Sequence, residues 1–238
     1  MRKLKFETGK IYHIYNRGVE KRVIFTNDSD YWRFLQALFL FNDEDASRNL
    51  LWELERQNGK LHFGILKKFV ESNNMERKPL VKILAYCLMP NHFHLVVEEI
   101  EEGGITKFMH RLGVGYSMYF NKKYERVGVL FQGRYKAALV EDDLQLQYLL
   151  VYINVLNPGQ IIEPKLKENG VKNVEAILNF AKTYWCTHLE YLDERESIII
   201  EKGILGELFR ENNEYENFVK DILEGKKINK INKLTFEN

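Results

Sequence analysis

Residues 84–99, with the sequence LAYCLMPNHFHLVVEE, constrain this chain more than any other segment. His92 and His94 stand one residue apart in an apolar, β-branched run that is typical of a strand. Successive side chains of a strand alternate faces, so both imidazoles project from one side and Phe93 from the other. Two histidines on a rigid strand suit a divalent cation that takes further ligands from elsewhere. The pattern also fits two polar residues on the solvated face of an antiparallel strand, and both interpretations stay open at this point.

Composition places the chain among globular proteins. Of its 238 residues, 45% are hydrophobic and 13% aromatic, which is enough for a buried core in one large domain. Cys87 and Cys186 lie in apolar patterns without metal-binding spacing and are predicted to be reduced core residues. The N-terminus resembles no signal peptide, and no apolar run reaches the roughly 18 residues that a membrane span needs. We therefore expect a soluble, cytoplasmic protein with no membrane partner.

The charges are unevenly placed although the net charge is only +1. Between Ile105 and Lys136 seven basic residues accompany a single acidic residue, Glu125, and aromatic residues are interleaved with them. Cations for phosphates and rings for base stacking are typical of a groove that binds single-stranded nucleic acid. The alternative is that the aromatic residues form the core face of a helix. The basic residues are Lys107, Arg111, Lys122, Lys123, Arg126, Arg134 and Lys136.

Periodicity and turn signals predict an α+β fold with the order strand, helix, strand, strand, helix, strand, which is the ferredoxin-like βαββαβ order. The elements are expected at 10–17, from Asp28 or Ser29 to about 41, 80–89, 93–98, 105–123 and 137–141. A further helix should begin after a cap at Asp142 or Asp143, run to about Leu156 and stop at Asn157-Pro158-Gly159.

The polar segment 42–79 has the composition of an insertion. After residue 165 the chain is helix-rich, with helices expected at 176–184 and 215–223. We therefore divide the chain into a ferredoxin-like antiparallel sheet domain over 1–165, interrupted by 42–79, and a helical C-terminal extension over 166–238.

The motifs YHIYNRG, YCLMPNHFHLVV, GYSMYFNKKYERVGVLFQGRYKA and VYINVLNP occur in this order. Together they resemble the single-tyrosine HUH transposases, particularly the branch of REP-associated tyrosine transposases, over about residues 8–165. The resemblance implies that a histidine pair and a polar helix residue bind Mg²⁺ or Mn²⁺. It further implies that a helix tyrosine attacks single-stranded or hairpin DNA, forms a 5′-phosphotyrosine and frees a 3′-hydroxyl. A phenol is a weak nucleophile at neutral pH, so a metal at the scissile phosphate fits this chemistry.

Carried over residue by residue, the resemblance assigns His92 and His94 to the metal and Tyr152 to the nucleophile, with Tyr148 one turn earlier as the runner-up. The family's amide ligand, four residues after the tyrosine, would be Leu156, which cannot bind a metal. Either the helix end is bulged so that Asn157 reaches the metal, or Asn154 binds it, or the third ligand is lost. A helix-terminating role also explains Asn157.

Residues at two loops are expected to contact DNA. Gln132, Arg134 and Lys136 lie in the FQGRYK segment, and Asn16 and Arg17 close the first strand, where a turn role is equally compatible. His110 is expected at the surface. His13, His62 and His188 have no partner spacing and receive no role.

Two other functions stay open. A domesticated relative would bind hairpin DNA without cleaving it, as the displaced asparagine suggests. A metal-dependent hydrolase that activates water would need an acidic cluster near the histidines, and Glu98 and Glu99 lie too far along the strand. The family resemblance allows either a monomer or a homodimer.

Overall fold

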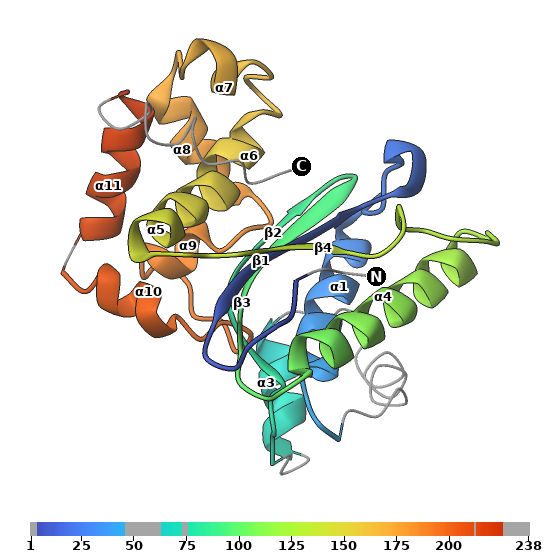
Figure 1. Ribbon diagram of the computed structural model, residues 1–238. Helices are drawn as coiled ribbons and strands as arrows, with labels where there is room; N and C mark the ends of the chain where they lie inside the picture. Colours follow the sequence, from blue (N-terminus) through green and yellow to red (C-terminus); the bar gives the residue numbers. More distant parts are fainter. Residues whose placement is uncertain (1–3, 46–62, 73–75, 212, 226–238) are drawn as a thin grey trace.

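A four-stranded antiparallel sheet forms the centre of the computed structural model, which describes residues 4–45, 63–72, 76–211 and 213–225 (Figure 1). The strand order is β2-β3-β1-β4 and every neighbouring pair is antiparallel, which confirms the ferredoxin-like prediction. The elements of this half are β1 (Ile11–Arg17), α1 (Asp28–Phe41), α3 (Phe63–Ser72), β2 (Val81–Met89), β3 (His92–Glu99), α4 (Gly104–Lys123) and β4 (Lys136–Leu139).

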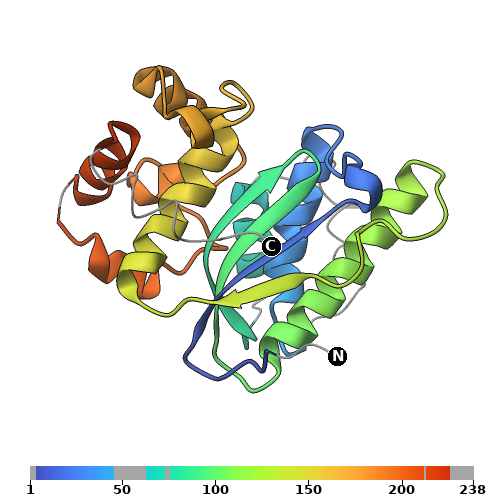
Figure 2. The ribbon, with the colours of Figure 1, turned by 45° about the horizontal axis from the view of Figure 1, so that its top comes forward.

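The two faces of the sheet are covered by different sets of helices (Figures 1 and 2). Helices α1 and α4 cover one face, where Phe93, Leu95 and Val97 of β3 join the core. The other face, with Val96, packs against the C-terminal half of the chain. The alternation along β3 therefore sends the side chains of His92 and His94 toward the C-terminal helices.

The C-terminal half is helical, as predicted. The helix after β4 comprises α5 (Asp143–Val151), a π-helical turn η2 (Tyr152–Leu156) and α6 (Asn157–Gly159). It is followed by α7 (Leu166–Asn169), α8 (Val174–Thr183), α9 (His188–Tyr191), α10 (Gly203–Leu208) and α11 (Glu214–Leu223). Side chains of α8, α10 and α11 share one hydrophobic core with β2 and α5. The boundary at 165/166 stays a prediction, but the described part of the extension packs directly on the sheet domain.

Two predicted helix ends differ from the structure. The helix was expected to run to about Leu156 and stop at Asn157-Pro158-Gly159, yet it continues through these residues to Gly159. Pro158 has no N–H to donate, and the carbonyl of Asn154, four residues earlier, accepts from the thiol of Cys186 at 3.4 Å instead. The N-cap of α1 is Asn27 rather than Asp28 or Ser29. The N-cap of α5 is Asp142, whose carboxylate accepts from the backbone N–H of Gln145 at 2.7 Å.

The insertion predicted over 42–79 falls in part on residues 46–62 and 73–75, which lie outside the described residues. The described portion includes α3. Among the residues that the structure describes, no helix is both long and apolar enough to span a bilayer.

Candidate functional site

The two histidines of β3 project from the same face of the sheet, as their spacing predicts. Their ring centroids lie 5.0 Å apart with the planes nearly perpendicular. His94 is fully buried and His92 half-buried, because the C-terminal helices cover this face. The alternative of two solvated polar residues is therefore wrong for His94.

A third histidine, His13 of β1, joins the pair although the sequence analysis gave it no role. Its Nε2 lies 2.9 Å from Nδ1 of His94, and the two rings stack at 5.1 Å. One of these nitrogens donates and the other accepts, so the contact couples the tautomers of the two rings and fixes the orientation of His94. The alternation His13-Ile14-Tyr15 and the pairing of β1 with β3 could have indicated this neighbour, because Tyr15 lies directly opposite His94.

Burial makes His94 a neutral ligand candidate. Its pKa lies well below the ordinary value, first because burial disfavours the imidazolium and then because positive charge on His92, His13 and Lys167 would lie nearby. A neutral imidazole keeps a lone pair for a cation, which is the form that metal binding requires.

The π-helical turn brings Tyr152 and Asn157 onto the histidine face. Its extra residue produces the bulged helix end that the sequence offered as one alternative. The ring of Tyr152 meets that of His94 edge-on at 5.9 Å between centroids. Nδ2 of Asn157 lies 3.4 Å from Nε2 of His92, and Oδ1 of Asn157 accepts from the side chain of Gln160 at 3.0 Å. Four side chains from β3 and one helix therefore converge at this point.

Asn154, the alternative ligand, is turned away from the histidines. Its Oδ1 accepts from the backbone N–H and the hydroxyl of Thr187 at 3.1 and 2.8 Å, and its Nδ2 donates to Tyr215 at 3.3 Å. The side chain is fully buried in these contacts. Asn154 thus ties the π turn to the segment before α9 and to α11, and the structure gives it a structural role.

Tyr148, the runner-up nucleophile, is a core residue. Its side chain is 1% exposed, packs on Phe218 of α11 at 5.4 Å and has its pKa raised by burial. Tyr152 instead faces the histidines, and its hydroxyl accepts a hydrogen bond from Lys167 at 2.8 Å. Neither Lys167 nor Gln160 was identified from the sequence, because nothing in their spacing links them to the histidine strand.

These residues fit a divalent cation only in part. Among the described residues, no group of three or more His, Cys, Asp or Glu side chains could hold a metal ion. His92, His94 and the amide oxygen of Asn157 provide the imidazole and oxygen donors that Mn²⁺ and Mg²⁺ accept, and such ions also take water and phosphate oxygens. The donor chemistry fits, but water or phosphate oxygens would have to complete the set.

Some of the residues predicted to bind DNA share the face of the histidines. Arg17 pairs directly with His92 across the strands, and Lys136 pairs with Tyr15, so their side chains leave the sheet on the same side. The guanidinium of Arg17 donates to the side chain of Gln132, which ties the loop before β4 to the end of β1. These residues place a cationic edge beside the candidate site.

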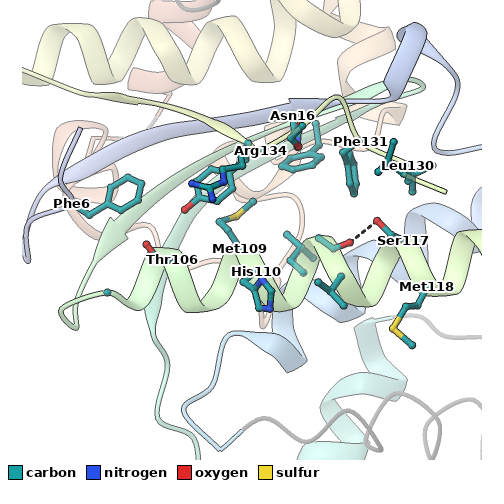
Figure 3. Close-up of a pocket in the computed structure, with 18 of the residues that line it drawn as sticks. Phe6, Asn16, Thr106, Met109, His110, Ser117, Met118, Leu130, Phe131 and Arg134 are labelled. Atoms are coloured by element: carbon teal, nitrogen blue, oxygen red, sulfur yellow. Dashed lines mark hydrogen bonds between the residues drawn. The ribbon is translucent and has the colours of Figure 1, made fainter. Parts of the chain in front are cut away.

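Other predicted contacts lie on the opposite face, beside α4. A groove of about 1230 Å³ lies there and is lined by Met109 and Phe131 among others. Figure 3 shows Asn16 and Arg134 above the helix. The amide of Asn16 donates to the carbonyl of Gly133 at 3.3 Å, which is the turn role that the sequence also allowed. Arg134 is exposed. The groove and the histidines are therefore separated by the sheet.

Two cations of α4 have visible partners within the fold. The guanidinium of Arg111 donates to the backbone carbonyls of Asp43 and Glu44. Nζ of Lys123 lies 2.6 Å from a carboxylate oxygen of the fully buried Asp30. The structure therefore assigns Arg111 and Lys123 to stabilising the fold, and their predicted contact with DNA stays a prediction. Lys107 and Lys122 are exposed, and Arg126 donates to the side chain of Asn121 at 3.0 Å, so for these three DNA contact stays a prediction.

Comparison with known proteins identifies a family that matches part of the chain. Residues 64–155, less than half of the chain, match the family model described as "Transposase IS200 like". The match begins within α3, in the segment predicted as an insertion, and ends within the π turn before Asn157. The resemblance to a tyrosine transposase is thereby confirmed at the level of this family.

A solved structure described as a REP-associated tyrosine transposase bound to a REP hairpin is similar to the chain at 12% identity. The TM-score is 0.47, and the similarity covers 85% of this chain and 91% of that one. No curated protein matches the sequence.

Proposed function

We propose that this chain, which contains an IS200-like transposase domain over residues 64–155, cuts and rejoins single-stranded DNA through a covalent bond to Tyr152. The observation that carries the proposal is the π turn. It holds the Tyr152 ring against His94 and the Asn157 amide against His92. In an ordinary α-helix, the five-residue spacing of Tyr152 and Asn157 would turn the two side chains toward different sides. A nucleophile beside three donor side chains is the minimum that such a reaction requires.

In the proposed reaction the oxygen of Tyr152 attacks a phosphodiester and the 3′-oxygen leaves. His92, His94 and Asn157 would hold Mg²⁺ or Mn²⁺, which would neutralise charge on the scissile phosphate. His13 keeps the His94 ring in one orientation through the 2.9 Å contact. Arg17 and Lys136 offer phosphate contacts on the same face.

The covalent link conserves the energy of the broken bond, so the strand can be rejoined without an external energy source. Hairpin-forming DNA is the proposed substrate, by family resemblance. The charges around α4 and the groove in Figure 3 lie on the far side of the sheet. They are suited to hold flanking DNA rather than the reacting phosphate.

The decisive experiment traps the adduct. Purified protein with Mn²⁺ or Mg²⁺ is incubated with oligonucleotides from the DNA that flanks the gene, labelled at either end. We expect a protease-sensitive adduct that retains the 5′ phosphate side of the break. Tyr152→Phe should lose it, and Tyr148→Phe, a matched control whose ring lies in the core, should keep it.

Metal binding is tested separately by calorimetric titration with Mn²⁺. His92→Ala and His94→Ala should each weaken Mn²⁺ binding and nearly abolish cleavage while hairpin affinity changes little. Undiminished Mn²⁺ affinity in the double variant would make the histidines structural. Absence of any adduct with wild-type protein would favour the non-catalytic hairpin-binding function.

A further inference from the structure

We propose that Lys167 is a second catalytic residue of this strand transfer, in that its ammonium holds the Tyr152 oxygen and stabilises negative charge on it. The inference rests on the proposed function of Tyr152. It names a residue from the C-terminal extension, outside the region that matches the transposase family model.

The ammonium of Lys167 contacts both the hydroxyl and the ring of Tyr152. Nζ of Lys167 donates to the phenol oxygen at 2.8 Å and lies 4.2 Å from the centroid of the ring. Tyr152 is 4% exposed and Lys167 is an exposed residue, so the contact joins a phenol shielded from water to an ammonium at the surface. A charged donor in such a setting forms a stronger hydrogen bond than a neutral one.

The position of Lys167 is set by its neighbour in α7. Leu166 is buried and packs close to Gly159 at the end of α6, where an added Cβ would come within 2.9 Å of it. This anchor fixes α7 against the helix that carries Tyr152. Lys167, an exposed residue, then extends its side chain from α7 to the hydroxyl of Tyr152.

The ammonium of Lys167 would act in both cleavage and rejoining. In cleavage the phenol releases its proton to water, its oxygen bonds to phosphorus, and the bond from phosphorus to the 3′-oxygen breaks. The 3′-oxygen keeps that electron pair and takes a proton from water. In rejoining, a 3′-hydroxyl loses its proton to water and attacks phosphorus, and the electron pair of the broken bond returns to the Tyr152 oxygen. Lys167 stays protonated throughout and faces the oxygen whenever it carries charge.

The test measures the rate of adduct formation at saturating DNA and the DNA concentration that gives half of that rate. Removal of one preorganised donor to a charged oxygen typically costs ~100-fold in rate. Lys167→Met should therefore lower the saturating rate about 100-fold, with the half-saturating concentration changed only a few-fold. Lys167→Arg should recover part of the loss, because it restores a cationic donor.

Lys172→Met is the matched control, since Lys172 is an exposed lysine of the same segment, and it should react like the wild type. Thermal melting verifies that all variants are folded. Equal rates for Lys167→Met and wild type would overturn the inference and leave the proposed function intact. No adduct with wild-type protein would overturn both. A raised half-saturating concentration at an unchanged saturating rate would make Lys167 a DNA-binding residue and overturn the inference.

Discussion

Lys123 offers a sharp test of which basic residues of α4 serve the fold and which serve DNA. Its ammonium lies 2.6 Å from Asp30, whose carboxylate also accepts from the hydroxyls of Tyr119 and Tyr124 and from the N–H of Thr26. Burial alone would raise the pKa of Asp30, but these four hydrogen bonds, that of Lys123 first, hold it below the ordinary value. Lys123→Met keeps the aliphatic stem and removes the charge.

The magnitude follows from burial. Removing one partner of a fully buried ion pair costs about 3–5 kcal/mol, because the other charge is left buried. The Lys123 side chain is 27% exposed, and Asp30 keeps three other hydrogen bonds, so we expect about 2 kcal/mol. For a protein of this size that corresponds to a melting temperature lower by about 4–8 °C.

Urea denaturation measures the stability of each variant, and hairpin binding at one fixed salt concentration measures its affinity for DNA. Together they show whether Lys123 serves the fold or DNA binding. We expect Lys123→Met to lose stability and to bind DNA nearly as wild type when folded. Lys122→Met, the exposed neighbour, should keep its stability. Unchanged stability of Lys123→Met together with a marked loss of DNA affinity would refute the reasoning.

Three further predictions concern the C-terminal layer and the helix end. Burial lowers the pKa of His188 to about 4 in the folded protein, so the unfolded chain binds this proton more readily. The contribution of neutral His188 to the free energy of unfolding is therefore complete above about pH 6.5, and about 3 kcal/mol of it is lost as the pH falls toward 4. Urea titrations at several pH values should show this loss, and His188→Gln should flatten it. Asn154→Ala should cost about 2 kcal/mol in urea titrations without changing the Mn²⁺ requirement of cleavage, because the buried donors of Thr187 keep only the carbonyl of Tyr86 as an acceptor. Asn157→Ala should raise that requirement about tenfold or more with little loss of stability, and an unchanged requirement would leave two histidines as the only protein ligands.

The sheet and the helices α1 and α4 could be predicted from the order and periods of their segments, but nothing in the sequence indicated that the C-terminal helices would cover the second face of the sheet. The strand of His92 and His94 is an example, since alternation alone determines that both rings share a face. Binding partners that come from distant parts of the chain could not be predicted in this way. His13 meets His94 only through the register of β1 with β3, and Lys167 meets Tyr152 only because α7 packs against α6.

The basic residues of α4 show what composition alone cannot distinguish. Composition identified the cluster, but could not tell that Arg111 is bound to backbone carbonyls or that Lys123 is paired with a buried aspartate. Such assignments depend on which side of a helix meets the core. A local excess of positive charge therefore contains both structural and surface cations, and only the packing separates them.

The π turn sets the spacing between Tyr152 and Asn157 along their helix. One residue more than the common spacing is absorbed as a wider turn, so the chain ahead of it and the chain behind it keep their orientation. An aligned sequence would show here an insertion that displaces the amide proposed as a metal ligand, and the protein would be classified as degenerate. Deleting one residue between Tyr152 and Asn157 should narrow the turn to ordinary α-helix while both ends stay on the same face. For relatives with such a helix, motif spacing alone is therefore an unsafe basis for inferring that activity has been lost.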